Sequence, residues 1–137
     1  MRFCSALPLI LAVMLAACTP RTQDPGPLAE TPMPPSLTET HFITPDGTQL
    51  PLRRWMPDTT PHAVIVTLHG FNDYSNAFAE IGPRLAEHGI AMIAYDQRGF
   101  GATDRAGSWP GGDRLRADAR AAIEAARESH PGARVYA

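Results

Sequence analysis

Three side chains in or beside glycine-containing loops could take part in acid–base or metal chemistry: His69, Asp73 and Asp96. His69 could act as a general base, but its place at the end of an expected strand, next to Gly70, favours a histidine that braces the loop. Neither aspartate has a second ligand at the spacing of a metal site, so we expect both to accept structural hydrogen bonds. The sequence therefore predicts no metal site.

No serine of this chain fits the nucleophile position of a G-x-S-x-G turn. That motif requires glycine two residues before and two residues after the serine. All five serines fail this test: Ser5, Ser36, Ser75, Ser108 and Ser129. Gly99 and Gly101 suggest dinucleotide binding, but the third glycine of that pattern would fall at Asp104. We therefore expect neither a catalytic nucleophile nor a cofactor site within these 137 residues.

Two apolar runs are expected to form buried strands. Residues 63–68 and 90–95 are nearly continuous in apolar side chains, which is typical of strands covered on both faces, as in a parallel sheet. Between them the pattern predicts a helix that ends at Gly89, with an apolar face of Phe78, Ile81 and Leu85. Pro83 requires this helix to begin shortly before it or to kink there.

A second helix is expected after a glycine-rich loop at residues 99–112. It runs from about Asp113 to Ser129 and has an apolar stripe of Leu115, Ala119, Ala122, Ile123 and Ala126. Trp109, within the loop, is interpreted as a packing residue. Residues 133–137 begin another extended run. Strands that alternate with helices in this way predict a doubly wound, mainly parallel sheet.

An antiparallel hairpin is expected ahead of this alternating part. Two short strand patterns, Glu39–Thr44 and Gln49–Met56, flank the turn signal Pro45-Asp46-Gly47. Pro51 lacks a backbone N–H, so the second strand should lie at a sheet edge or contain a bulge. The predicted fold class is therefore α/β, with an N-terminal hairpin, in a domain that spans residues 38–137.

Residues 1–17 have the pattern of a signal peptide. Arg2 precedes an apolar run that is shorter than the roughly 20 residues of a membrane-spanning helix. The run ends in Leu15-Ala16-Ala17-Cys18, which resembles the lipobox of bacterial lipoproteins. Lipid chains on Cys18 would anchor the protein, because each buried methylene contributes about 0.8 kcal/mol. The alternative is an ordinary signal peptide with an incidental cysteine.

A proline-rich segment at residues 18–37 separates this signal from the predicted domain. Six of the fourteen prolines lie in it, with few large apolar residues, so we expect an extended linker. Thr19 is not the aspartate that often retains lipoproteins in the inner membrane, which favours a lipid anchor in the outer membrane of a bacterial cell envelope. The formal net charge of −2 argues against a nucleic-acid partner, since such partners need a basic surface.

The two loop sequences resemble those of α/β-hydrolases. Residues 68–75, LHGFNDYS, are similar to the loop after the third strand of that fold. Residues 95–104, YDQRGFGATD, are similar to its D-x-R-G-x-G-x-S segment after the fourth strand, and residues 130–136 resemble the approach to the fifth. In order and spacing, residues 39–137 resemble the group that contains monoacylglycerol lipases, lysophospholipases and serine aminopeptidases.

The resemblance implies serine-hydrolase chemistry. In such enzymes a serine attacks an ester carbonyl, a histidine takes its proton, and two backbone N–H groups stabilise the oxyanion. One donor would be the backbone N–H of Phe71, and Gly70 would permit close approach because it has no Cβ. The sequence departs from the family pattern at Asn72, where many relatives carry glycine, and at Thr103, which replaces the usual serine.

The nucleophile, acid and base of this family would come after Ala137. We therefore expect a fold truncated before the nucleophile elbow and inactive as given, with residues 90–95 near an unpaired sheet edge. The predicted function of the complete protein is hydrolysis of carboxylic esters, with a small-molecule ester or a lipid as substrate. Two alternatives stay open: a peptidase or amidase on the same fold, and a non-catalytic lipoprotein that uses the fold for binding.

Overall fold

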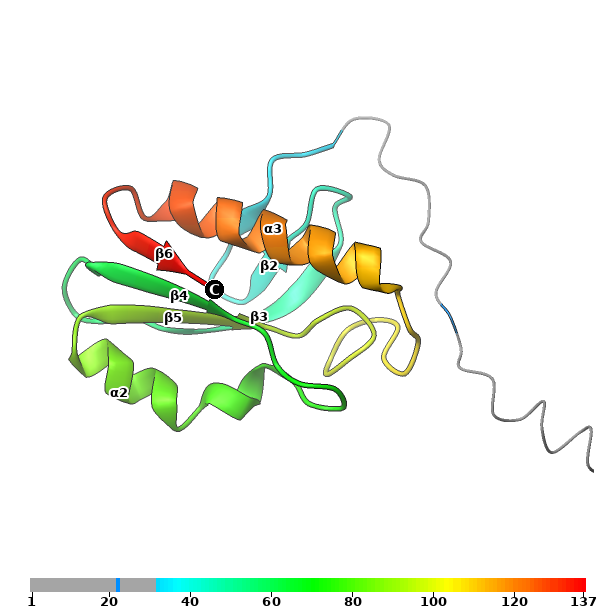
Figure 1. Cartoon of the computed structure of the whole chain (residues 1–137), viewed down its shortest axis with the longest axis horizontal. Coiled ribbons are helices and arrows are strands. Elements are labelled where there is room, and N and C mark those ends of the chain that lie inside the picture. Colours follow the sequence, from blue (N-terminus) through cyan, green and yellow to red (C-terminus); the bar gives the residue numbers. More distant parts are fainter. Residues whose placement is uncertain (1–21, 23–31) are drawn as a thin grey trace, which may run out of the picture.

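A computed structural model describes Thr22 and residues 32–137 of the chain (Figure 1). Cys18, the predicted signal peptide and most of the predicted linker lie outside the described residues. The elements are β1 (Ser36–Leu37), β2 (His41–Ile43), β3 (Gln49–Trp55), β4 (Ala63–Thr67), the 3-10 helix η1 (Ser75–Phe78), α2 (Ile81–Glu87), β5 (Ile90–Tyr95), α3 (Gly112–Ser129) and β6 (Arg134–Tyr136). Within the described residues, no helix has both the length and the apolar character needed to cross a bilayer.

The strands form one mixed sheet in the order β1-β2-β3-β5-β4-β6. The first three strands make an antiparallel meander, β3 pairs antiparallel with β5, and β4 pairs parallel with both β5 and β6. The α/β class and the hairpin are confirmed. The prediction of a mainly parallel sheet is wrong for this chain, because β3 continues past the hairpin and docks its second half on β5.

The apolar run at residues 90–95 lies inside the sheet, so its predicted place near an unpaired edge is wrong. β5 has β3 on one side and β4 on the other, and β4 in turn is flanked by β6. The physical reason is the direction of the crossovers. After β4 the chain crosses over through α2 and places β5 between β4 and β3. Only the next crossover, through α3, places a strand, β6, on the other side of β4.

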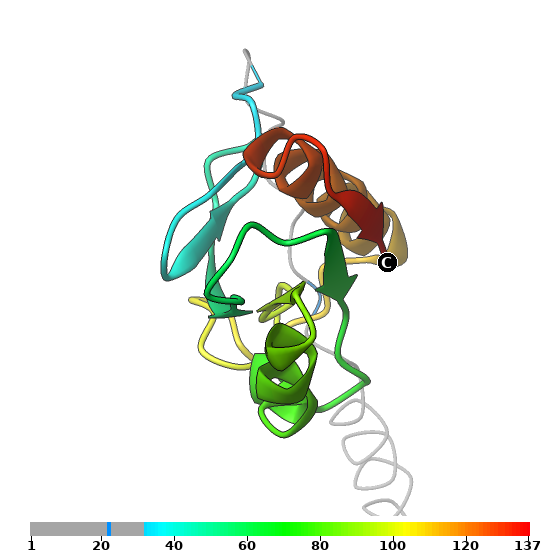
Figure 2. The same cartoon turned by 90° about the vertical axis from the view of Figure 1, so that its left-hand side faces the viewer.

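Helices cover both faces of the sheet, as the doubly wound pattern predicts. In Figure 1, α3 lies above the sheet and α2 below it, and Figure 2 shows the same layers from the side. The core lies between α3 and the sheet. Its largest fully buried apolar side chains are Phe42, Leu50, Val64, Ile93 and Tyr95.

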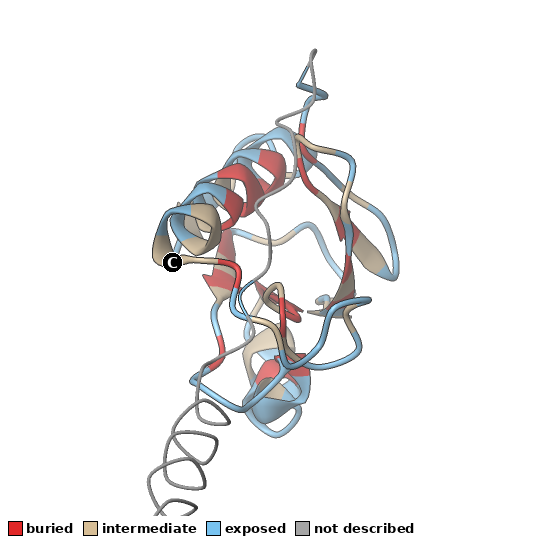
Figure 3. Ribbon diagram, turned by 90° about the vertical axis from the view of Figure 1, so that its right-hand side faces the viewer, coloured by how far each residue is buried: buried red, intermediate tan, exposed pale blue. Residues whose placement is uncertain are grey.

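The buried faces of both helices differ from the predicted stripes. Figure 3 shows the buried residues of α3 on one side of the helix, and they are Asp118, Ala121, Ala122, Ala125 and Ala126. On α2, Ile81 is 44% exposed, whereas Gly82 is buried against the Trp55 ring, which a Cβ there would overlap. Pro83 lies in the first turn of α2, where its missing N–H has no intrahelical partner to lose. The helix therefore begins just before the proline, one of the two options that the sequence left open.

Strand β3 changes partner at Pro51 instead of lying at an edge. Residues 49–51 pair with β2, and residues 52–55 pair with β5. The Pro51 carbonyl accepts a hydrogen bond from the N–H of Asp96 (2.8 Å). The missing N–H of the proline therefore falls at the end of the second ladder and breaks neither, which is why an interior strand tolerates it.

A buried ion cluster joins the hairpin turn, the end of β5 and helix α3. Arg98 donates hydrogen bonds to both carboxylate oxygens of Asp118 (2.6 and 3.1 Å) and to Oδ1 of Asp46 (2.7 Å). Arg114 donates to the other oxygen of Asp46 (3.0 Å). Each carboxylate therefore has a cationic partner, which a charge removed from water requires.

The hairpin turn presents Asp46 to this cluster. The N–H of Gly47 donates to the Thr44 carbonyl (2.8 Å), and Gly47 adopts a φ of +78°, as the turn signal predicts. Arg98 also donates to the hydroxyls of Thr48 (2.8 Å) and Thr44 (3.0 Å). Burial raises the pKa of Asp46, but hydrogen bonds from Arg98 and Thr44 outweigh burial, so this pKa lies well below its ordinary value.

Replacing Arg98 with methionine should lower the free energy of unfolding of the complete protein by about 3–5 kcal/mol, because two buried carboxylates lose the cation they share. The control is Arg116→Met on α3, whose ion pair with Asp113 is exposed (63% for the Arg116 side chain). Its loss should stay below about 1 kcal/mol. Urea unfolding measures both variants, and equal losses would contradict a central role for Arg98.

Asp46→Asn should remove part of the pH dependence of stability. Because folding lowers the pKa of Asp46, its ionised form stabilises the fold above the unfolded pKa of about 3.9. This contribution is lost as the pH falls through the lower folded pKa. The wild-type protein should therefore be more stable than the variant at neutral pH, and the difference should shrink below about pH 4. Thermal unfolding measured across that range tests this, and a constant difference would show that the carboxylate charge does not hold the turn.

Candidate active site

His69 joins the loop after β4 to the loop after β5. The residue is buried, with Nδ1 2.9 Å from the Gly70 carbonyl oxygen and Nε2 3.0 Å from the backbone nitrogen of Gln97. Because the Gln97 N–H can only donate, Nε2 is the acceptor and Nδ1 carries the proton. The Gln97 side chain donates to the His69 carbonyl (2.7 Å). Both ring nitrogens are thus used within the protein, which confirms the predicted bracing histidine.

The loop after β4 makes a tight turn at residues 70–73. The N–H of Asp73 donates to the Gly70 carbonyl (3.2 Å), and Asn72 adopts a φ of +61°. Asparagine tolerates this left-handed conformation better than most residues, which explains how it can stand at a position where the family resemblance implies glycine. Phe71 occupies the second position of the turn and Asn72 the third, as in a type II turn.

The backbone N–H of Phe71 donates to no group among the described residues, whereas the N–H groups of Asp73, Tyr74 and Ser75 further along the loop are bonded. The N–H groups of Asp73, Tyr74 and Ser75 donate to the Gly70 carbonyl, the Asp73 carboxylate and the Asp96 carboxylate. Phe71 is 77% exposed. A backbone N–H that has no acceptor and lies in a hydrogen-bonded turn has the properties of an oxyanion donor. The assignment of that role to Phe71 stays a prediction.

Gly70 leaves open space next to this N–H. In the described part of the chain, a Cβ built on Gly70 would meet no atom within 4 Å. Packing therefore does not require glycine at this position. A ligand that approaches Phe71 would meet no Gly70 side chain, which is compatible with the supporting role that the family resemblance implies.

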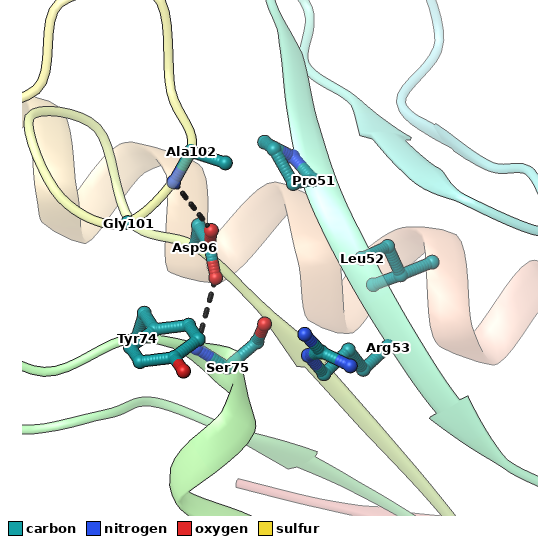
Figure 4. Close-up of a pocket in the computed structure, with 8 residues that line it drawn as sticks. All are labelled: Pro51, Leu52, Arg53, Tyr74, Ser75, Asp96, Gly101 and Ala102. Carbon is teal, nitrogen blue, oxygen red and sulfur yellow. Dashed lines mark hydrogen bonds between the residues drawn. The ribbon is translucent and has the colours of Figure 1, made fainter.

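Asp96 lies between the two loops and holds both with its two carboxylate oxygens (Figure 4). Oδ1 accepts from the N–H of Ser75 (2.8 Å) and Oδ2 from the N–H of Ala102 (2.8 Å). The side chain is buried, and a Cβ on Gly101, whose φ is +56°, would overlap its carboxylate. This confirms the predicted structural role of Asp96. Asp73 likewise accepts a hydrogen bond, from the N–H of Tyr74 (2.8 Å).

The cavity drawn in Figure 4 does not contain a catalytic dyad. It has a volume of about 550 Å³ and is lined by Pro51, Leu52, Arg53, Tyr74, Ser75, Asp96, Gly101 and Ala102. Ser75 meets Asp96 through its backbone N–H, and no histidine lines the cavity. In residues 32–137, no group of three or more His, Cys, Asp or Glu side chains could hold a metal.

A second, more apolar cavity of about 370 Å³ lies between the two loops. It is lined by residues 71–74 from one loop and by residues 99–101 and 106–109 from the other. The rings of Phe71 and Phe100 meet edge to face, with centroids 5.6 Å apart. Trp109, interpreted from the sequence as a packing residue, is 39% exposed and lines this cavity. The cavity can hold an apolar group beside Phe71.

Sequence reasoning did not single out two residues that shape this site, Gln97 and Phe100. Gln97 hydrogen-bonds His69 through its backbone and its side chain, and the Phe100 ring lies between His69 and Phe71. Both residues lie within the D-x-R-G-x-G segment directly after a buried strand. Their position in that motif could have indicated a role in the site. Only the fold shows that they contact His69 and Phe71 of the other loop.

The sequence of the chain is similar to that of known hydrolases. Residues 59–137 match the family described as serine aminopeptidase, S33. The monoacylglycerol lipase of Mycolicibacterium smegmatis is 30% identical over 64 residues, which cover 47% of this chain and 23% of that protein. The monoglyceride lipase of Homo sapiens is 31% identical over 64 residues, which cover 47% of this chain and 21% of that protein.

Solved structures share the fold over part of their length. A thermostable carboxyl esterase from Bacillus coagulans superposes with a TM-score of 0.59 at 19% identity, covering 72% of this chain and 33% of that one. An alpha/beta hydrolase from Penicillium sp. sh18 superposes with a TM-score of 0.56 at 28% identity, covering 64% of this chain and 31% of that one. The chain thus spans about a third of these hydrolases and under a quarter of the two lipases. Since the family match covers more than half of the chain, the chain belongs to the serine aminopeptidase S33 family of α/β-hydrolases.

Proposed function

We propose that the complete protein is a serine hydrolase of carboxylic esters, with monoacylglycerols or lysophospholipids as its substrate class. The observation that carries this proposal is the N–H of Phe71, which has no acceptor in the described part of the chain and stands beside an apolar cavity. An ester bound there would place its carbonyl oxygen at the N–H and its acyl chain in the cavity. The similarity to two monoglyceride lipases supports an ester substrate.

The residues of this chain would supply one half of an oxyanion hole. When a serine attacks the ester carbonyl, the carbonyl oxygen gains negative charge, and the Phe71 N–H would stabilise that charge together with the N–H after the serine. His69 would not act as the base, because both of its ring nitrogens are already bonded. The serine, the acid and the catalytic histidine would come from sequence beyond Ala137.

The anchor is the second part of the proposal. Leu15-Ala16-Ala17-Cys18 supports cleavage before Cys18 and lipid attachment to its thiol, with the protein held in the outer membrane of a bacterial cell. A lipid anchor would keep the hydrolase at a surface where its proposed substrates occur.

Deleting the Phe71 N–H should lower the turnover of the complete protein. Phe71→Pro removes the donor, and proline suits the second position of a type II turn, so the loop should keep its shape. We expect kcat on a short activated ester to fall about 10²–10³-fold, the usual effect of losing one oxyanion donor. Circular dichroism checks the fold. A folded proline variant with full turnover would show that the oxyanion hole is not at Phe71.

Phe71→Ala is the matched control, because it keeps the N–H and removes only the ring. It should change KM for a lipid ester more than kcat. Covalent trapping of the wild-type protein by a fluorophosphonate tests the proposal as a whole. Trapping with activity on aminoacyl amides alone would favour the peptidase, and no trapping would favour the non-catalytic binding module.

Replacing Cys18 with serine should abolish lipid attachment, because a hydroxyl cannot form the thioether. Cells that express the protein are labelled with a fatty-acid analogue, and the purified protein is assayed for label. The wild-type protein should carry the label in the outer-membrane fraction. Label that survives in the Cys18→Ser variant would disprove the proposed anchor, and Cys4→Ser, which lies in the predicted signal peptide, serves as the control that should stay labelled.

A further inference from the structure

Thr22, the one described residue ahead of residue 32, is joined to the loop that lines the apolar cavity. A parallel β-bridge joins Thr22 to Trp109. Cys18 precedes Thr22 by four residues, and four residues of fully extended chain span at most about 14 Å. A lipid on Cys18 would therefore be attached no farther than about 14 Å from Thr22, the residue that pairs with Trp109. The proposed anchor is thus tied by a short tether to the loop that lines the cavity.

In the part of the chain that the structure describes, three exposed aromatic residues line this cavity: Phe71, Tyr74 and Trp109. They come from the loops after β4 and β5, which leave the sheet at the same end in Figure 1. We call these three residues the aromatic face. Tryptophan and tyrosine favour the boundary between membrane and water, where an apolar ring and a polar group are both accommodated.

We propose that the aromatic face docks on the phospholipid bilayer that holds the Cys18 anchor, so that the cavity opens into the membrane surface. As an account of substrate access this rests on the proposed ester hydrolysis, and it names a membrane-resident lipid ester as the substrate. Such an ester would reach the Phe71 N–H without its acyl chain crossing water. The bilayer is the occupant because the short tether from Cys18 to the Thr22 bridge limits how far the proposed anchor can lie from the loop that carries Trp109.

The charge of the chain indicates how this docking would work. With a formal net charge of −2, the chain has no excess of basic residues to attract anionic lipids. The aromatic face should therefore bind by burial of its rings, which salt does not screen. Docking should occur on neutral phosphatidylcholine and persist at high ionic strength.

Vesicle flotation tests the docking without the lipid anchor. The protein is complete apart from residues 1–17, which are deleted, and it carries Cys18→Ser. The protein should float with phosphatidylcholine vesicles, and 1 M salt should not release it. Phe71→Ser with Trp109→Ser should lower the partition coefficient by about tenfold or more. Met56→Ser is the matched control, since Met56 is 37% exposed and follows the opposite end of β3, where Trp55 pairs with Met92. Equal partitioning of all variants, or none by the parent protein, would overturn the proposal.

A second measurement uses the lipidated protein and does not depend on the folding of the double variant. A fluorophore is attached to Phe71→Cys or to Met56→Cys in protein reconstituted into vesicles that contain a quencher-labelled phosphatidylcholine. The label at position 71 should be quenched and that at position 56 should not. Equal quenching at both positions would overturn the proposal. If the protein docks on vesicles but is not trapped by a fluorophosphonate, the proposed hydrolase is disproved and the docking proposal stands. If it is trapped but does not dock, the docking proposal is disproved and the proposed hydrolase stands.

Discussion

The ion cluster around Arg98 is the interaction on which the rest of the structure depends. It connects three separate parts of the chain: the hairpin turn at Asp46, the loop after β5 at Arg98, and the α3 residue Asp118. A guanidinium suits this position because its planar set of donors reaches both carboxylates and two threonine hydroxyls at once. A lysine has one ammonium with three donors and could not reach these groups simultaneously.

The position of Arg98 also links the ion cluster to the candidate site. Asp96 and Gln97 immediately precede it, and they hold the loop after β4 through Ser75 and His69. Outside η1 these loops have no ladder or helix to satisfy their backbone groups, so turns and side chains do so. The short segment after β5 therefore anchors two parts of the structure. Arg98 holds the hairpin and α3, and Asp96 and Gln97 hold the loop after β4.

The sequence was sufficient to predict the elements whose signal is local. The apolar runs at residues 63–68 and 90–95 form strands, Gly89 ends α2 with a φ of +74°, and Pro45-Asp46-Gly47 forms the hairpin turn. The bracing role of His69 and the structural role of Asp96 were also predictable, because both residues stand at the ends of buried strands. These features depend on a few neighbouring residues and on no distant partner.

The features that the sequence did not reveal depend on partners far away in the chain. Asp118 lies four residues before Ala122, so its spacing places it on the apolar face of α3. The carboxylate can be buried there because Arg98, 20 residues earlier, neutralises its charge. Gly82 replaces Ile81 on the buried side of α2 because the Trp55 ring of β3 occupies that space. The antiparallel pairing of β3 with β5 joins residues about forty positions apart, and no local pattern indicates it.

The turn at Phe71 shows how the fold can combine an exposed ring with a positioned backbone group. Hydrogen bonds from the residues that follow fix the turn on one side, and His69 fixes Gly70 on the other. The left-handed conformation of Asn72 then sets the direction of the chain at Phe71. One turn orients both the ring, which lines the cavity, and the N–H of the same residue. In the proposed hydrolase, this turn would therefore couple binding of the apolar part of a ligand against the Phe71 ring to polarisation of its carbonyl by the Phe71 N–H.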